Sequence, residues 1–177
     1  MLLYHGSYSE IKTPDLNYGR YNLDFGKGFY VTGHKEQAEK WALRRAMAAR
    51  HIRGFAQAGF VTVYESDLDS AGLNILSFDG YSESWLDFVV ANRGNLEAVY
   101  NSKYDVIYGN VADDDVAQAV DAYMELLRKN RVNKTVKDAL LYQLTFSHPN
   151  DQYCFVTNKS LALLKFLHSY EVEDANK

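Results

Sequence analysis

Three short segments combine residue types that could bind a flat ligand carrying hydroxyl groups. The segments are Leu3-Tyr4-His5-Gly6-Ser7, Asp24-Phe25-Gly26-Lys27-Gly28-Phe29-Tyr30-Val31-Thr32 and Asp151-Gln152-Tyr153-Cys154-Phe155-Val156. An imidazole and an amide can hydrogen-bond to hydroxyls, a tyrosine ring can stack on a planar group, and a glycine allows close approach to the backbone. The chain also has 14 tyrosines against 9 phenylalanines, which suits stacking combined with polar contacts at ring edges.

Other kinds of site are not indicated by the sequence. No metal-ligand spacing is present, because the histidines are scattered and unpaired with cysteine, at positions 5, 34, 51, 148 and 168. There is no Gly-x-Ser-x-Gly nucleophile motif and no P-loop. The pair Gly26 and Gly28 precedes a β-favouring run instead of following one, so it is not a Rossmann fingerprint.

Composition predicts one domain spanning residues 1–177 and a cytoplasmic protein with no membrane segment. The chain has 177 residues, a net charge of −4, and no apolar run long enough to span a bilayer. The acidic balance argues against a domain built mainly to hold phosphate backbones, and the cluster Arg44, Arg45, Arg50 and Arg53 is interpreted as the solvated face of a helix. The single cysteine, Cys154, excludes an internal disulfide and is expected to be a small buried strand residue.

The elements that must position the three segments are short strands and helices in irregular alternation, which predicts an α+β fold. Strands are expected at 2–5, 29–32, 60–64, 73–78, 104–111 and 153–157. Helices are expected after Thr32 or Gly33 with Ala38, Trp41, Ala42 and Met47 on one stripe, after Ser84 as cap, from Asp113 to about Lys129, and over 135–144. Residues 160–167 are expected to form a last helical or turn segment.

In their order and spacing, the three segments resemble the signature segments of ADP-ribosyltransferases of the poly(ADP-ribose) polymerase and diphtheria-toxin branch. The pattern is most similar to a bacterial family of uncharacterised domains, DUF3990, which carries His-Gly-Ser, Asp-Phe-Gly-x-Gly-Phe-Tyr-x-Thr and a late Gln-x-x-Phe. The resemblance runs from residue 3 to about 167, so it covers nearly the whole chain. It implies an ADP-ribosyltransferase-like split β-sandwich with flanking helices, which binds NAD as a substrate and needs no metal.

The resemblance also implies a role for each site residue. His5 would bond the adenosine-side ribose, Gly6 would hold the nicotinamide carboxamide, and Tyr30 would stack on the nicotinamide with Ser7 assisting. Gly28 belongs to the glycine-rich turn of the cofactor site. Arg20 could meet the pyrophosphate, although a surface ion pair with Asp24 is an equal alternative. Trp41 is interpreted as core packing beneath the site, and Trp85, Asn92 and Arg93 as a cluster that could line one wall.

Gln152 stands where this branch usually carries a glutamate. An amide can still accept a hydrogen bond from a ribose hydroxyl, but it has no charge and cannot act as a base. The expected triad is His5, Tyr30 and Gln152, in a mono-ADP-ribosyltransferase-like enzyme that cleaves the nicotinamide–ribose bond of NAD. Hydrolysis of NAD, or binding of NAD or ADP-ribose without turnover, remains an alternative.

The resemblance leaves open the source of a carboxylate in the site and the identity of the acceptor. Asp24 or Asp151 could supply the missing carboxylate, but Asp151 should point away from Gln152 if both lie on one strand. The acceptor could be protein or nucleic acid, and the compact form of the family suggests a toxin or defence role with an antitoxin or regulatory partner.

Overall fold

The protein has a mixed α+β fold with two β-sheets, as the sequence predicts. The computed structural model describes residues 1–53, 58–69, 72–94, 103–112, 114–145 and 150–172. The first sheet contains β1 (Leu2–Ser7), β3 (Gly59–Glu65) and β7 (Lys165–Val172), in the antiparallel order β1-β3-β7. The second sheet has the order β2-β6-β5-β4 and contains β2 (Phe29–Val31), β4 (Ile75–Ser77), β5 (Val106–Asn110) and β6 (Asp151–Phe155). Only the β4–β5 pair of the second sheet is parallel.

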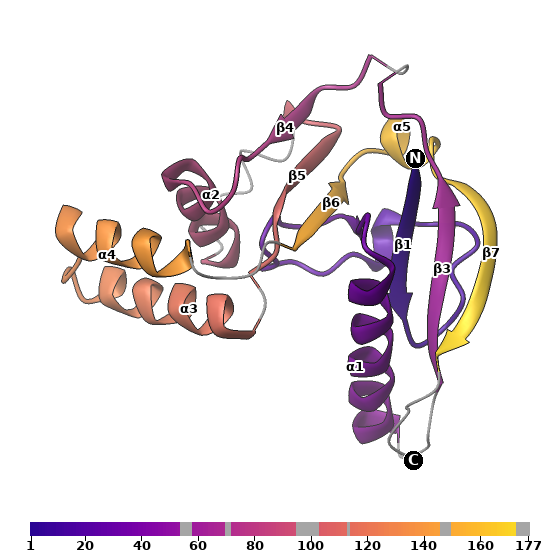
Figure 1. Ribbon diagram of the computed structural model, residues 1–177, viewed down its shortest axis with the longest axis horizontal. Helices are drawn as coiled ribbons and strands as arrows, with labels where there is room; N and C mark the ends of the chain where they lie inside the picture. The colour runs from indigo at the N-terminus through magenta and orange to yellow at the C-terminus, as the bar shows by residue number, and fades with distance from the viewer. Residues whose placement is uncertain (54–57, 70–71, 95–102, 113, 146–149, 173–177) are drawn as a thin grey trace.

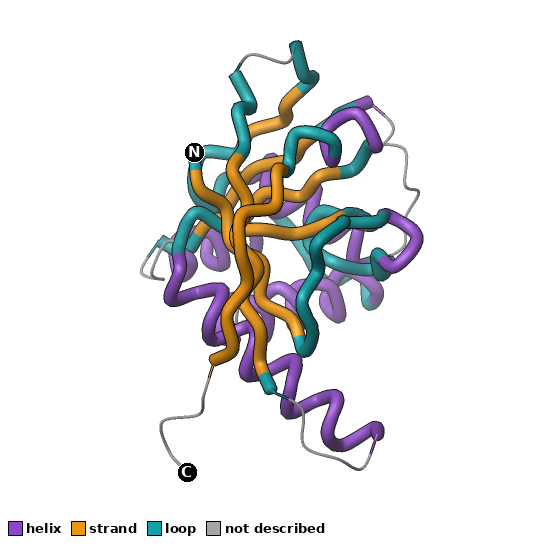
Figure 2. Tube along the Cα trace, turned by 90° about the vertical axis from the view of Figure 1, so that its right-hand side faces the viewer, coloured by secondary structure: helices purple, strands orange, loops and turns teal. Residues whose placement is uncertain are grey.

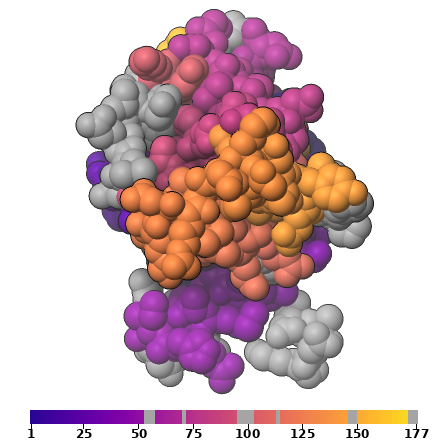
Figure 3. Space-filling view, turned by 90° about the vertical axis from the view of Figure 1, so that its left-hand side faces the viewer, coloured from indigo at the N-terminus to yellow at the C-terminus, as the bar shows by residue number. Residues whose placement is uncertain are grey.

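The helices divide between the two sheets (Figure 1). Helix α1 (Lys35–Arg53) runs along the first sheet, whereas α2 (Glu83–Arg93), α3 (Asp114–Arg128) and α4 (Lys134–Leu144) gather beside the second. The short helix α5 (Asn158–Leu161) leads into β7, and a 3₁₀ turn spans Leu16–Tyr18. Figure 3 shows α3 and α4 forming one outer face of the molecule, with α1 below them. Over the described ranges, no helix is both long enough and apolar enough to cross a membrane.

The two sheets meet at one short contact between β1 and β2. Tyr4 and Thr32 exchange both backbone hydrogen bonds, at N–O distances of 2.9 and 3.0 Å. Seen from the side, the strands of the two sheets cross close to one another (Figure 2). Beyond Tyr4 and Thr32 the strands part, so the candidate residues of β1 and β2 lie at the place where the two sheets diverge.

Apolar side chains fill three regions around this junction. One lies between the second sheet and helices α2 to α4 and includes Phe25, Trp85 and Ile107. A second lies between the two sheets and includes Leu3, Phe29 and Phe155. The third lies between the first sheet and α1. The second sheet is therefore covered on both faces, and opposite faces of β2 and β6 meet different regions.

Helix α1 packs through small residues, which corrects the predicted stripe. Its buried positions are Ala38, Ala42, Ala46 and Ala49, at 0–7% exposure, whereas Trp41 is 36% exposed and Met47 is 53% exposed. The reason lies in the first sheet, where Gly6 and Gly59 allow the helix backbone to approach closely. Alanines spaced by four and three residues fit this approach, and a large indole or thioether does not.

Two further expectations need correction. The helical or turn segment expected over 160–167 is confirmed at its beginning, where α5 ends and a turn follows, but from Lys165 on the chain forms strand β7. Both of its faces are partly exposed, so the usual alternation of apolar and polar residues is weak there. Helix α2 is capped by Ser82, whose Oγ accepts from the Trp85 N–H, and not by Ser84. The other predicted strands and helices are confirmed to within a few residues, and Asp113 lies outside the described residues.

Candidate functional site

His5 bridges the two sheets where they separate. Its Nδ1 lies 2.7 Å from the backbone oxygen of Tyr30, and its ring stacks on Phe29 with centroids 4.4 Å apart. A carbonyl oxygen only accepts, so Nδ1 carries the proton and donates. If β1 and β2 continued to pair beyond Tyr4 and Thr32, Gly6 would face Tyr30. The His5 side chain takes the place of that backbone bond.

The surroundings of His5 keep its ring neutral. Burial lowers the pKa of His5 from 6.5 to about 4; the hydrogen bond to Tyr30 opposes this shift, and the positive charge of Arg45 adds to it. With Nδ1 protonated, Nε2 of the neutral ring is an acceptor. No hydrogen bond to Nε2 is found among the described residues, and Nε2 is not one of their sealed, unpartnered polar atoms, of which Ser66 Oγ is the single case. His5 therefore offers an acceptor to solvent or to a ligand.

This arrangement predicts a pH dependence of stability. Between pH 6.5 and about 4 the unfolded chain binds a proton at His5 that the folded protein does not, so the free energy of unfolding rises with pH across this window and then levels off. We expect a contribution of about 2 kcal/mol, which is reduced from the full shift because the ring is only half-buried. Urea unfolding from pH 4 to 8 measures it.

The control for this prediction is a second histidine. His5→Gln should remove the His5 part of the pH profile, whereas His51→Gln, on the exposed face of α1, should leave the profile unchanged. Superimposable profiles for the parent and His5→Gln would contradict the assignment.

Gly6 directs its peptide groups toward the gap between the sheets. Tyr4 bonds to Thr32 on the side away from β3, and the direction of backbone groups alternates along a strand. The N–H and C=O of Gly6, two residues further on, therefore point to the same side as those of Tyr4. Within the part of the chain that the structure describes, no backbone bond joins Gly6 to β2. A Cβ at Gly6 would lie 3.0 Å from the Cβ of Trp41, on the face of the strand that α1 covers, and Trp41 is 36% exposed.

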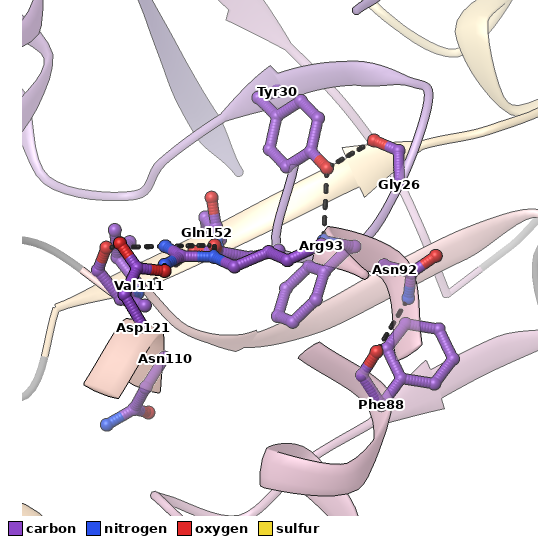
Figure 4. A network of polar contacts seen from close by, with 12 residues as sticks. Gly26, Tyr30, Phe88, Asn92, Arg93, Asn110, Val111, Asp121 and Gln152 are labelled. Atoms are coloured by element: carbon purple, nitrogen blue, oxygen red, sulfur yellow. Dashed lines mark hydrogen bonds and ion pairs between the residues drawn. The ribbon is translucent and has the colours of Figure 1, made fainter. Parts of the chain in front are cut away.

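Tyr30 is held by both ends of the glycine-rich turn. Its hydroxyl donates to the Gly26 oxygen at 2.6 Å and accepts from the Phe25 N–H at 3.2 Å (Figure 4). Burial, with further contributions from Cys154 and Asp24, raises the pKa of Tyr30 well above its ordinary value. The hydroxyl is therefore a neutral group that fixes the ring, and the half-buried ring itself is the part left to contact a ligand.

Gln152 belongs to a buried polar network centred on Asp24. The Gln152 Nε2 donates to Asp24 Oδ2 at 3.2 Å, and the Ala112 N–H donates to the same oxygen at 3.0 Å. Arg93 donates to Asp24 Oδ1 through Nε at 2.8 Å and approaches it through Nη2 at 2.7 Å, while its Nη1 contacts Asp121 at 3.1 Å. Figure 4 shows Arg93 extending across this network toward Gln152 and Asp121. The expected surface pair of Asp24 with Arg20 is thus wrong, because Arg93 takes that place.

Tyr30 and Gln152 share one face of the second sheet. Tyr30 is paired with Cys154, which lies two residues from Gln152 and so on the same face of β6. His5 stacks on Phe29, whose side chain points to the opposite face of β2. The structure therefore brings His5 to Tyr30 through the main chain, and Tyr30 to Gln152 across the sheet face, but it does not set the imidazole and phenol rings side by side.

Asp151 points away from Gln152, as its place on the strand predicts. Its carboxylate accepts from the hydroxyl of Thr32 at 3.0 Å and the N–H of Gly33 at 3.3 Å, and it lies 3.4 Å from Nε2 of His34. These contacts fix the beginning of α1 after β2. Asp151 serves that junction, and Asp24 is the carboxylate next to Gln152.

Arg20 and Arg45 form a positive region beside His5. Arg45 extends from α1 over the Tyr8 ring, with its guanidinium carbon 5.8 Å from the centroid. Burial, followed by the positive charge of Arg20, lowers the pKa of Arg45, so the two guanidinium groups lie near each other. Neither one forms a salt bridge with a described carboxylate. The sequence was interpreted as placing Arg45 on a solvated helix face. Its proximity to Tyr8 and His5 depends on how α1 packs against β1, which no local pattern indicates.

The remaining residues singled out from the sequence differ in their burial and contacts. Gly28 is buried, and a Cβ there would lie 2.3 Å from the Cys154 sulfur, so contact with β6 accounts for the glycine. Ser7 is buried on the same face of β1 as His5. Cys154 is fully buried, and burial raises its pKa to about 12, which agrees with an inert strand residue. Trp41, expected in the core, is instead partly exposed and carries Arg44 over its ring at 5.5 Å.

Comparison with known proteins places the chain in a family. The family model described as a protein of unknown function (DUF3990) matches residues 1–166. The chain belongs to this family. No curated protein and no solved structure matches it. The match spans all of β1, β2 and β6, so His5, Tyr30 and Gln152 of this DUF3990 protein lie within the family region.

Proposed function

We propose that this DUF3990 protein binds NAD and transfers its ADP-ribose to a macromolecular acceptor. The observation that carries the proposal is a set of open hydrogen-bonding groups on β1 and β6, the two strands on either side of β2. The set consists of the neutral Nε2 of His5, the peptide groups of Gly6, and the carbonyl oxygen of Gln152. Ribose hydroxyls are donors that suit the two side-chain acceptors, and a carboxamide has one donor and one acceptor side, which suits the N–H and C=O of a single strand residue.

Aromatic and cationic groups around this set support a dinucleotide. The half-buried ring of Tyr30 is fixed by its hydroxyl, and the Cβ of the partly exposed Trp41 lies close to Gly6, so both rings are candidates for stacking. Two guanidinium groups without carboxylate partners among the described residues, Arg20 and Arg45, suit a pyrophosphate. The division into two sheets that meet at β1 and β2 is compatible with the split β-sandwich that the sequence resemblance implies.

The proposed reaction needs electrostatic help more than proton transfer. The bond between the anomeric carbon and the nicotinamide nitrogen breaks, the nitrogen keeps the electron pair, and neutral nicotinamide leaves. An oxygen, nitrogen or sulfur atom of the acceptor then bonds to the cationic carbon and loses its proton to solvent or to a base of its own, since Gln152 cannot accept it. Gln152 would contribute a carbonyl oxygen that bonds to a ribose hydroxyl as positive charge develops.

The uncharged Gln152 also favours a second candidate, which is binding of NAD or ADP-ribose with slow hydrolysis or without turnover. An amide has no charge with which to stabilise the developing cation, so its hydrogen bond to a ribose hydroxyl favours the transition state over the ground state less than that of a carboxylate. Both candidates use the same site residues and differ in the release of nicotinamide.

Labelled NAD tests the proposal. Incubation of the protein with adenylate-labelled NAD and either lysate proteins or nucleic acid should move label onto a macromolecule and release nicotinamide. Tyr30→Ala should lower the rate about 10- to 100-fold, because base–aromatic stacking is worth about 1–3 kcal/mol. Tyr30→Phe keeps the ring and loses only the bonds to Gly26 and Phe25, so it should keep most of the activity.

Each outcome selects between the candidates. An NAD-dependent thermal shift with no release of nicotinamide would favour the binding module. If the parent protein unfolds cooperatively but shows neither an NAD-dependent thermal shift nor release of nicotinamide, both candidate functions are contradicted. Equal losses in Tyr30→Ala and Tyr30→Phe would assign the effect to the hydroxyl and not to stacking.

A further inference from the structure

We propose that Asp24 is the charged member of the candidate site and acts as a positioning residue through Gln152. In this arrangement the carboxylate orients the Gln152 amide, and its negative charge lies one hydrogen bond behind the oxygen that meets the ligand. The inference rests on the proposed function and deepens it, because it explains how a glutamine can occupy the place of a glutamate.

Asp24 is built to hold charge at this position. Its side chain is 10% exposed, and both oxygens are used: Oδ1 by Arg93, and Oδ2 by the Ala112 N–H and the Gln152 Nε2. All of these contacts are N–H groups that need an acceptor, and a carboxylate is acceptor-only when ionised. Arg93 balances the charge at Oδ1, the oxygen that Gln152 does not contact, and Asp121, which is 68% exposed, holds the outer end of Arg93.

The same contact determines which atom of Gln152 faces outward. Because a carboxylate oxygen can only accept, the amide nitrogen must face Asp24 and Oε1 must face elsewhere. Oε1 has no hydrogen-bond partner in the described ranges, and it is not sealed from solvent, since Ser66 Oγ is the single buried and unpartnered side-chain polar atom found there. The side chain as a whole is only 8% exposed, so the acceptor oxygen is what a nearly buried Gln152 presents.

The short distance between the two side chains also explains the absence of a glutamate. A carboxylate at position 152 would stand about as close to Asp24 as the amide does now, at 3.2 Å, and two like charges at that separation in a buried site repel strongly. The site therefore holds one negative charge. An amide that donates to a carboxylate is polarised by it, which strengthens the acceptor character of its carbonyl oxygen toward a ribose hydroxyl.

A charge swap tests this inference. The variants are Asp24→Asn, Gln152→Glu and the double Asp24→Asn/Gln152→Glu, with Asp121→Asn as a control that changes the same network at its exposed end. The readouts are kcat and KM for nicotinamide release from NAD, together with the unfolding temperature. We expect Asp24→Asn to lower kcat at least about tenfold with a smaller change in KM, because the effect grows with the developing cation.

Gln152→Glu alone should lower the unfolding temperature and kcat through like-charge repulsion. The double variant restores a single carboxylate to the site and should recover both the unfolding temperature and kcat, with kcat within about threefold of the parent or above it. Asp121→Asn should change kcat by no more than about twofold and should leave the unfolding temperature nearly unchanged. This non-additive recovery is what a merely structural role for Asp24 would not produce.

The results separate this inference from the proposed function. A parent protein that releases no nicotinamide overturns both. An active parent whose kcat is unchanged in Asp24→Asn, or a double variant no better than the worse single variant in kcat and unfolding temperature, overturns the role of Asp24 and leaves the proposed function standing.

Discussion

Replacing Arg93 with alanine is expected to lower the free energy of unfolding by about 3–5 kcal/mol. The Arg93 side chain is 16% exposed and bonds to the buried Asp24 through Nε, with Nη2 at 2.7 Å. Its Nη2 also donates to the Ala112 oxygen at 3.2 Å. Removing the guanidinium leaves Asp24 buried and charged, with only the N–H groups of Ala112 and Gln152 beside it. Urea unfolding at neutral pH measures the loss.

Four further variants isolate the buried charge of Asp24 as the cause. Asp121→Asn removes the exposed partner of Arg93 and should cost less than about 1 kcal/mol, as exposed ion pairs do. The double Arg93→Met/Asp24→Asn removes both charges and should be more stable than Arg93→Met alone. Either of two results would show that Arg93 and Asp24 are not a coupled buried pair. One is a loss below about 1 kcal/mol in Arg93→Ala; the other is a loss of unfolding free energy in the double variant equal to the sum of the losses in Arg93→Met and Asp24→Asn.

Local patterns in the sequence predict most of the strands and helices. Turn glycines, β-branched runs and capping residues predicted strands β1 to β6 and helices α1 to α4, because these signals act within a few residues of one another. Strand β7 was missed because it pairs with β3 about a hundred residues away and is partly exposed on both faces. Nothing within the segment 165–172 marks that pairing.

The candidate site shows the same division between local and distant information. His5, Tyr30 and Gln152 stand out by motif and order, and the alternation along β6 correctly turned Asp151 away from Gln152. The partner of Asp24 could not be predicted, because Arg93 lies 69 residues away and the nearby Arg20 was an equally good choice by charge. Charge identifies a residue that needs a partner, but only the packing of α2 against the second sheet decides which one it meets.

Helix α1 gives a further example of a property that depends on contacts between elements. A 3.6-residue period fits several stripes on this helix, and hydrophobicity alone selects Trp41 and Met47. The glycines of the first sheet select Ala38 and Ala42 instead. As a result Trp41 is left 36% exposed.

Gly6→Ala is expected to lower the free energy of unfolding by about 3 kcal/mol or more. A Cβ at this position would lie 2.1 Å from the Ala38 oxygen and 2.7 Å from the Ala42 nitrogen, and both are helix backbone atoms that cannot move aside as a flexible side chain can. Relief requires that α1 shift away from the first sheet. Thermal and urea unfolding measure the loss.

Gly33→Ala is the matched control, because its nearest neighbour would be a carboxylate oxygen of Asp151 at 3.8 Å, and it should change stability by no more than about 0.5 kcal/mol. Equal stability of the two variants would contradict the close contact of α1 with β1. The comparison also separates two reasons for a glycine at position 6. Helix packing requires the missing side chain whether or not a ligand binds, so the evidence for a ligand at Gly6 comes from its peptide groups, which point into the gap, and not from the residue type.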